Sequence, residues 1–245
     1  MTAKKVTNSS SARKVAIVGS ASSSVHQTPW EDRSFDIWGL AWRLDLQRVT
    51  AVFDIHSLNE QQRNVPEHYK EILAKVGFDV YLKEPSDDLP NAKIYPIEAA
   101  QQFLKQYHPR HETKYFASSI AYMFVFAILQ NYDEIHFYGV DLLDNTEYGH
   151  QRPNLEFLIG VARGLGITVY MPEESALCRF PYMYGYEHAP AIGLVTPVML
   201  RDRIKQYQEK SEKCMAEAYT ADGAKQEARQ LLQLLEFHER GGAGL

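Results

Sequence analysis

The chain has 245 residues, a length that allows one sizeable hydrophobic core with an appendage. Its 45% hydrophobic and 23% charged residues are typical of a globular protein and exclude wholesale disorder. A net charge of −5 gives no basic footprint for nucleic acid, and two cysteines, Cys178 and Cys214, do not make a disulfide framework. At the start of the chain, residues 1–13 lack an apolar signal core, and no later run approaches a membrane span of about 20 residues. We therefore expect a flexible tail at 1–13 and a cytoplasmic protein.

Short apolar runs predict the strands of a parallel sheet that is buried on both faces. The first run, 14–19, leads into a turn of small residues. Helical patterns alternate with the later runs, which predicts a doubly wound, mostly parallel α/β sheet. The later strands are expected at 35–40, 51–56, 80–82, 135–140 and 167–170, and the helices at 66–76, 97–107, 118–129 and 155–164. Between them, 87–96 is predicted to be turn-rich and 143–153 to be a polar loop.

The pattern changes after about residue 180. The aromatic segment at 181–186 either seals the core or stacks on a base or sugar ring. Residues 197–238 are rich in Lys, Glu and Gln and predict a C-terminal helical appendage, which Asp222-Gly223 is expected to break into two helices. We therefore predict an α/β domain at 14–180, the aromatic segment and C-terminal helices at 181–240, and a disordered tail at 241–245. The appendage is also a candidate for homo-oligomer contacts.

Two turns of small residues are candidates for holding a nucleotide. Gly19, Ser20 and Ser23 allow a ligand to approach the backbone, although this turn lacks the later glycines of G-x-G-x-x-G and equally suits a simple turn. This lack argues against a nicotinamide cofactor. Ser118 and Ser119 open an apolar helix, and the free N–H groups at a helix N-terminus suit a phosphate.

The ends of two predicted strands supply further polar groups. The strand at 135–140 delivers Gly139 and Asp141 to the carboxyl edge of the sheet, where open α/β folds bind ligands. An aspartate in that position equally caps the following turn. Asp54 and His56 lie two residues apart and share a face, directed either at a ligand or into the structure. No Asp-x-Asp pair is present, and we expect neither a metal nor a cofactor.

Several segments match one family in order and spacing. They are Gly19-Ser-Ala-Ser-Ser, Ala117-Ser-Ser-Ile-Ala-Tyr-Met, Asp133-Glu-Ile-His-Phe-Tyr-Gly-Val-Asp, His150, and Pro172-Glu-Glu-Ser-Ala-Leu. Together they resemble the bacterial CMP-sialic-acid-dependent sialyltransferases and the related motility-accessory glycosyltransferase-like proteins. The resemblance covers roughly residues 14–180 and implies a Rossmann-like fold. The chain also looks like uncharacterised bacteriophage proteins that share the Gly-Val-Asp and Gln-Arg-Pro segments.

The resemblance implies a role for each matching residue. The two serines of the helix turn would hold the nucleotide phosphates, and the first turn would border the nucleoside and sugar. His150 stands where these enzymes carry the base that deprotonates the acceptor hydroxyl, and Asp141 would orient it or a sugar hydroxyl. Histidine suits this task because its ordinary pKa of about 6.5 lies near neutral pH. Alternatively, His150 is a solvated loop residue, and the neighbouring Arg152 is either a phosphate or acceptor contact or a surface arginine.

The chain departs from the family pattern in ways that leave two functions open. Ser20 replaces an asparagine, Ser119 replaces a glycine, and the segment 142–149 is shorter than the family's lid. We predict a metal-independent nucleotide-sugar glycosyltransferase whose acceptor is a glycan, a small molecule or a modified phage DNA base, in the host cytoplasm if the protein is phage-encoded. The alternative is a non-catalytic nucleotide-binding protein that serves as a sensor, a sequestering agent or an assembly accessory.

Overall fold

A computed structural model describes residues 12–41, 48–56, 69–142, 145–180, 182–188 and 197–241. The chain divides into two compact units between Ala191 and Ile192, and each unit is described by itself. Nearly all of the two predicted tails, 1–13 and 241–245, lies outside the described residues. Among the described helices, none is both long and apolar enough to cross a membrane.

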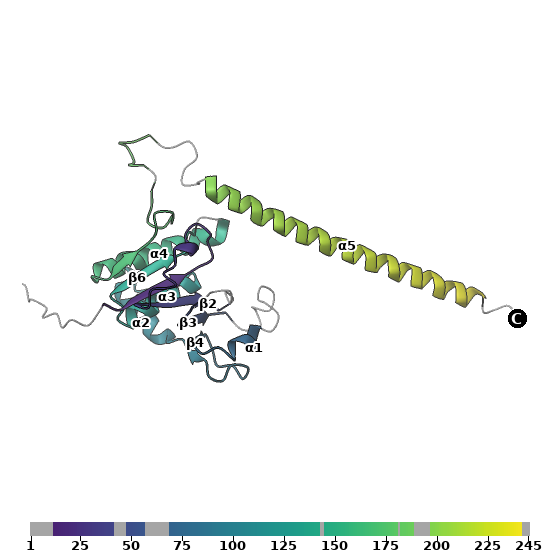
Figure 1. Ribbon diagram of the computed structural model, residues 1–245, viewed down its shortest axis with the longest axis horizontal. Coiled ribbons are helices and arrows are strands. Elements are labelled where there is room, and N and C mark those ends of the chain that lie inside the picture. Colours follow the sequence, from purple (N-terminus) through teal and green to yellow (C-terminus); the bar gives the residue numbers. More distant parts are fainter. Residues whose placement is uncertain are drawn as a thin grey trace, which may run out of the picture. The chain divides into compact units, whose positions relative to one another are not determined.

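The first unit is built on a seven-stranded sheet in which all neighbouring strands are parallel, in the order β5-β4-β3-β2-β1-β6-β7 (Figure 1). The strands are β1 (Lys14–Val18), β2 (Phe35–Leu40), β3 (Ala51–Asp54), β4 (Asp79–Leu82), β5 (Lys93–Ile94), β6 (Glu134–Tyr138) and β7 (Thr168–Tyr170). The chain moves outward from β1 to β5 and then returns to place β6 on the other side of β1. The strand order therefore reverses between β1 and β6, and the predicted doubly wound, parallel sheet is confirmed.

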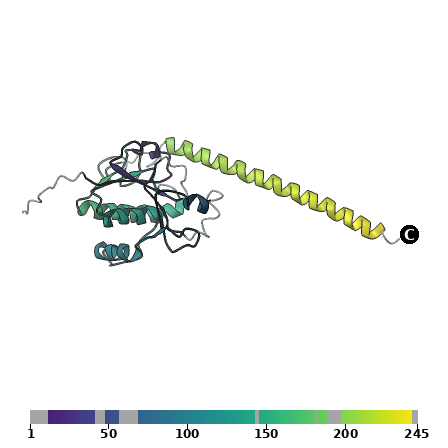
Figure 2. The same cartoon turned by 60° about the horizontal axis from the view of Figure 1, so that its bottom comes forward.

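Helical segments cover both faces of this sheet. They are the 3₁₀ helix η1 (Val25–Gln27), α1 (Tyr69–Leu73), α2 (Ile97–Tyr107), α3 (Ser119–Leu129) and α4 (Asn145–Gly164). Val15 and Ile17 of β1 face a core shared with α2, α3 and α4, and Figure 2 shows these teal helices on one side of the strands. Ala16 and Val18 face the opposite core, which also contains Val25 of η1. These four side chains, Val15 to Val18, are fully buried, which explains the continuous apolar run in the sequence.

Two elements of the first unit differ from the predictions. The predicted loop at 143–153 is wrong over residues 145–153, because α4 already begins at Asn145 and contains Pro153. A proline has no N–H for the carbonyl four residues before it, and it therefore indicated a helix boundary that the structure does not have. The second difference is β5, a two-residue strand within the segment predicted to be turn-rich, which is too short to produce an alternating pattern.

The described part of the second unit is one helix, α5 (Pro197–Gly241), of 45 residues. The predicted break at Asp222-Gly223 is wrong, because α5 continues through both residues. A glycine within a helix costs only about 1 kcal/mol relative to alanine, which a long run of good helix formers can offset. Asp222 also supports the helix locally, since its carboxylate lies 3.5 Å from Lys225 Nζ and accepts a hydrogen bond from the side chain of Gln226.

Two glycines bring the carboxyl ends of β1 and β6 together. The Gly19 N–H donates to the carbonyl of Tyr138, and the Ala21 N–H donates to the carbonyl of Gly139, both at 2.8 Å. A Cβ on Gly19 would lie 2.3 Å from the Gly139 carbonyl oxygen, and Gly139 itself has a left-handed φ of 65°. A side chain at Gly19 would clash with this carbonyl, and one at Gly139 would be strained.

We expect Gly19→Ala to lower the free energy of unfolding by about 1–3 kcal/mol, because a backbone carbonyl cannot move aside as a flexible side chain does. Gly160→Ala is the matched control: this exposed position within α4 has nothing within 4 Å of a new Cβ. In this control, the free energy of unfolding should rise by about 0.5–1 kcal/mol, because alanine has a higher helix propensity than glycine. Urea unfolding followed by circular dichroism measures both changes. If the urea midpoint of Gly19→Ala equals that of the wild type, the turns after β1 and β6 can move apart without loss of stability, and the prediction is wrong.

Candidate functional site

Three turns meet beyond the carboxyl ends of β1, β6 and β7. The Gly139 N–H, after β6, donates to the hydroxyl of Ser24, after β1, at 2.9 Å. The Ser175 hydroxyl, after β7, donates to the carbonyl of Val140 at 2.9 Å, and the side chain of Gln27 donates to that of Glu174 at 3.0 Å. These contacts join the turns at the point where the strand order reverses, the place where open α/β sheets bind ligands.

Asp141 is a buried carboxylate within this cluster. Only 8% of its surface is exposed, and its carboxylate accepts hydrogen bonds from the Ser23 hydroxyl and the Ala176 N–H. Its Oδ1 atom has no hydrogen-bond partner among the described residues. Burial raises the pKa of Asp141 above its ordinary value, although the two hydrogen bonds act in the opposite direction. This oxygen is itself buried, so a ligand hydroxyl can reach its vacant lone pairs only through a shift of the covering atoms or through a bridging water.

The N-terminus of α3 lies at the same edge of the sheet, because α3 immediately precedes β6 and runs back along it. Ser118 is the N-cap, and its Oγ accepts a hydrogen bond from the Ala121 N–H at 3.2 Å. This bond uses one lone pair and leaves the hydroxyl proton available for donation. Ser119 and Ile120 are the first two helical residues, and a helix provides no carbonyl acceptor for their N–H groups. The partial positive charge of this helix end suits a phosphate.

Asn154 of α4 fixes the segment that leads into α3, and the sequence analysis did not identify it. Its Oδ1 accepts a hydrogen bond from the Ala117 N–H at 3.1 Å, and its Nδ2 donates to the Tyr115 carbonyl at 2.7 Å. The side chain is fully buried. The signal in the sequence was a polar residue directly before the apolar helical pattern that begins at Leu155, but its partners lie almost 40 residues away.

His150 is an exposed residue of α4, not of a loop. It lies four residues before Asn154, so the two side chains occupy the same side of α4, one turn apart. Because Asn154 holds the chain just before Ser118, this spacing places His150 about one helical turn from the segment that opens α3. The proximity of His150 to the two serines and its role as a base both stay predictions.

Arg152 makes its contacts within the protein. Its Nε donates to Glu156 Oε1 at 2.8 Å, and its Nη2 donates to the carbonyl of Arg179 at 3.2 Å. The N–H of Cys178 donates to the same Glu156 oxygen at 2.8 Å. Arg152 thus joins α4 to the segment after β7. A contact with phosphate or acceptor stays a prediction.

His56 lies apart from the cluster around Asp141. The backbone N–H of His56 donates to Asp54 Oδ1 at 3.2 Å, and its ring Nδ1 lies 3.6 Å from the same oxygen. Asp54 is the last residue of β3, and His56 follows it. In the sheet, β2 lies between β3 and β1. Two strand spacings amount to roughly 10 Å. The same-face prediction for this pair fits the geometry, whereas a ligand contact by His56 stays a prediction.

The remaining predicted residues differ in their exposure. Gly19 and Gly139 are buried against one another, so chain packing accounts for both. Of the two serines predicted in the first turn, Ser20 is exposed and Ser23 is partly buried. The aromatic segment does not seal the core as predicted, because Tyr184 is 86% exposed and Tyr186 87% exposed. Among the described residues, no group of three His, Cys, Asp or Glu side chains forms a candidate metal site.

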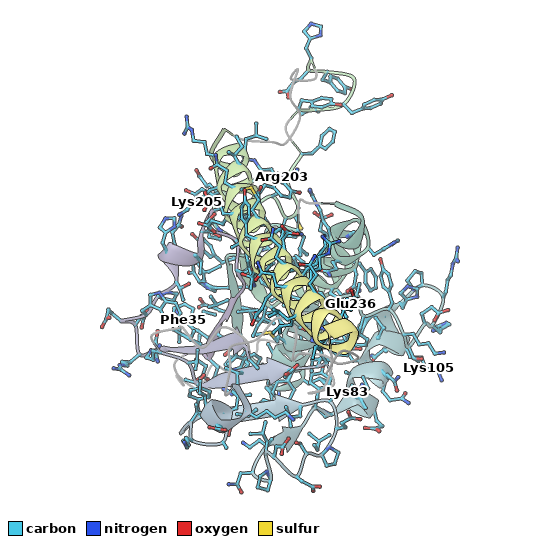
Figure 3. The ribbon with its side chains drawn as sticks, turned by 90° about the vertical axis from the view of Figure 1, so that its right-hand side faces the viewer. Phe35, Lys83, Lys105, Arg203, Lys205 and Glu236 are labelled. Carbon is cyan, nitrogen blue, oxygen red and sulfur yellow. The ribbon has the colours of Figure 1, made fainter. Side chains whose placement is uncertain are left out.

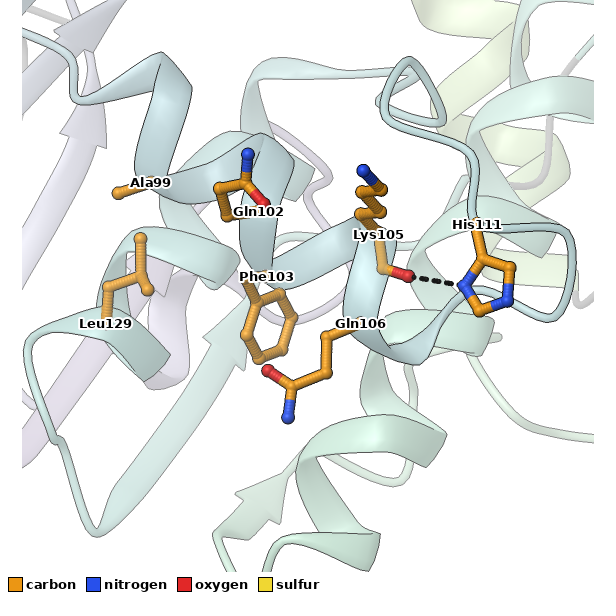
Figure 4. A pocket seen from close by; sticks show the side chains of 7 residues that line it. All are labelled: Ala99, Gln102, Phe103, Lys105, Gln106, His111 and Leu129. Atoms are coloured by element: carbon orange, nitrogen blue, oxygen red, sulfur yellow. Dashed lines mark hydrogen bonds between the residues drawn. The ribbon is translucent and has the colours of Figure 1, made fainter.

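A hollow of about 630 Å³ lies between α2 and the C-terminal end of α3 (Figure 4). Its lining includes Phe103 and Leu129, and His111 Nδ1 lies 3.0 Å from the Lys105 carbonyl at its border. Leu129 is the last residue of α3, whereas Ser118 precedes its first residue. The hollow is therefore at the opposite end of α3 from the candidate site and is not part of it.

No protein-family model matches the chain, and no curated protein matches it significantly. Among solved structures, the chain is similar to sialyltransferases from Campylobacter jejuni. The monofunctional alpha-2,3-sialyltransferase Cst-I is 15% identical over 88% of this chain and 100% of that chain, with a TM-score of 0.47. The sialyltransferase CstII with cytidine-5'-monophosphate is 20% identical over 65% of this chain and 79% of that chain, with a TM-score of 0.40.

We expect the buried charge of Asp141 to destabilise the unliganded protein. Since its pKa is raised in the folded state, the folded protein binds more protons than the unfolded chain as pH rises above the ordinary value of 3.8. The free energy of unfolding therefore falls through that window until the folded-state pKa is passed, and the loss persists at pH 7. Asp141→Asn removes the charge, so its melting temperature should exceed that of the wild type at pH 7 and approach it near pH 4. Thermal unfolding from pH 4 to 7.5 measures this difference. A variant whose melting temperature relative to the wild type does not rise between pH 4 and pH 7 would contradict it.

Proposed function

We propose that the protein transfers a sugar from a nucleotide-sugar donor to an acceptor hydroxyl. The observation that carries the proposal is the buried Oδ1 of Asp141, which has no hydrogen-bond partner among the described residues and lies where the strand order reverses. The same edge of the sheet presents the N-terminus of α3. One group accepts a hydrogen bond from a sugar or ribose hydroxyl, and the other receives a phosphate. The family motifs in the sequence support the same assignment.

In the proposed reaction, the donor phosphate lies at Ser118 and Ser119. His150 takes the proton from the acceptor hydroxyl through a ring nitrogen. The acceptor oxygen then forms a bond to the anomeric carbon, while the bond from that carbon to the phosphate oxygen breaks and its electron pair leaves with the nucleotide. The α3 N-terminus stabilises the negative charge that develops on the leaving phosphate. His150 finally releases its proton to solvent, and transfer is metal-independent, as the sequence resemblance implies.

The exposed position of His150 leaves the acceptor side open to more than one class of molecule. We propose a glycan or a small hydroxyl compound first, because a net charge of −5 provides no field that attracts DNA. A modified DNA base is retained as a member of the acceptor panel, so that the assay decides between these classes.

We expect Ser119→Ala to weaken nucleotide binding by about 10-fold or more, since hydrogen bonds to charged groups contribute about 1.5–3 kcal/mol. Its stability should stay unchanged, because the capping bond belongs to Ser118. Ser118→Ala is the matched comparison: it should weaken nucleotide binding and also lower the free energy of unfolding by about 1 kcal/mol, because the helix cap is lost.

The measurements are thermal unfolding and calorimetric titration with the nucleotide that gives the largest thermal shift in a screen. A ligand present at about 100 times its dissociation constant raises the free energy of unfolding by about 2.7 kcal/mol, which a thermal shift detects. Unchanged nucleotide affinity in both variants would contradict the proposal that the phosphate binds at the N-terminus of α3.

We expect His150→Ala to reduce sugar transfer by about 10²–10⁴-fold while nucleotide affinity is retained, because a general base contributes about that factor. His188→Ala, at another exposed histidine, is the control and should keep full activity. The assay pairs nucleotide sugars with glycan, small-molecule and duplex-DNA acceptors. A wild-type protein that binds nucleotide but transfers to none of them would indicate the non-catalytic binding protein instead.

A further inference from the structure

Helix α5 carries an apolar stripe with a seven-residue repeat. Alternating steps of four and three residues give the a and d positions of five heptads. These positions are Leu200, Ile204, Tyr207, Ser211, Cys214, Ala218, Ala221, Lys225, Ala228, Leu232 and Leu235. Large apolar side chains occupy the two ends of the stripe, and its middle holds small side chains together with Lys225. The large ones are between 43% and 63% exposed.

Such a stripe predicts a second helix packed along it. An isolated helix in water draws little stability from its own hydrogen bonds and depends on the packing of its apolar face. A heptad pattern sustained over more than three or four repeats is the signature of a coiled coil. We propose that α5 pairs with α5 of a second copy of this chain, and that the two helices run antiparallel. This inference is independent of the proposed function.

The distribution of charge along α5 favours the antiparallel direction. Residues 197–213 contain five Lys or Arg and three Asp or Glu, whereas residues 214–241 contain three and five. The first half is therefore net positive and the second half net negative. Figure 3 shows Arg203 and Lys205 towards one end of α5 and Glu236 towards the other. An antiparallel pair places each positive half beside a negative half, whereas a parallel pair places like beside like.

Individual positions in the stripe give the same direction. In a parallel pair, Lys225 at an a position would face Lys225 of the partner, and Glu217 at g would lie beside Asp222 of the partner at e. Both contacts are between like charges.

An antiparallel pair can be centred where the a and d positions are small. With Ala218 opposite Ala221 of the partner, Ile204 lies across from Leu235 of the partner. In this register Lys225 faces Cys214 of the partner rather than another lysine. The geometry thus assigns one direction and one register.

The first experiment measures the mass of the full chain by light scattering during gel filtration. We expect a dimer of twice the 28.1 kDa chain. Leu235→Lys should raise the dimer dissociation constant by at least about 100-fold, since it places a charge in the seam. Tyr219→Lys is the matched control: Tyr219 is an apolar residue of the same helix, 79% exposed, but it lies outside the stripe and should leave the dimer intact. A wild-type monomer, or a dimer that Leu235→Lys does not weaken, overturns the pairing.

The second experiment measures direction with a short bis-maleimide cross-linker, after Cys178→Ser and Cys214→Ser remove the native thiols. Ile204→Cys together with Leu235→Cys should give a cross-linked dimer, and Ile204→Cys alone should not. The two positions within one helix are roughly 46 Å apart, at about 1.5 Å per residue, so a link within one chain is excluded. A cross-linked dimer from Ile204→Cys alone would overturn the antiparallel direction.

Discussion

The contact between the backbones at Gly19 and Gly139 is the constraint on which the arrangement of the site depends. A Cβ at Gly19 has no room, since it would lie 2.3 Å from a carbonyl oxygen, and Gly139 has a left-handed backbone. Because the two turns touch directly, their hydrogen bonds form between residues more than 100 positions apart, such as Ser24 and Gly139. The same closeness places the Ser23 hydroxyl on Asp141. The polar groups of the site are thus positioned by backbone packing.

The site combines groups that stabilise the fold with one that costs stability. Asn154 has both ends of its amide hydrogen-bonded although it is fully buried, so it orders the chain before α3 without a penalty. Asp141 is also buried, but one of its oxygens has no partner among the described residues. A buried polar group left unsatisfied in a native protein requires an explanation, and binding of a ligand is the one proposed for Asp141.

Local pattern predicted the sheet but not the contacts that build the site. The fully buried run at β1 and the apolar helix α3 are strong local signals, and both elements lie where the sequence placed them. Pro153 and Gly223 are local breakers that longer helices tolerate, and each produced a wrong boundary. The assumed break at Gly223 also concealed the heptad repeat, which is visible only when α5 is continuous. Asn154 was missed because its partners are distant in the sequence.

Pro153 has a consequence for the motion of α4. It cannot donate a hydrogen bond to the carbonyl of Gly149, so the turn that carries His150 is tied to the rest of the helix by fewer bonds than an ordinary turn. The part of α4 after Pro153 is anchored in the core through Leu155 and Leu158. Local opening can therefore begin at the front of α4 and stop at Pro153. His150 lies in the part of α4 before Pro153, where this backbone hydrogen bond is missing.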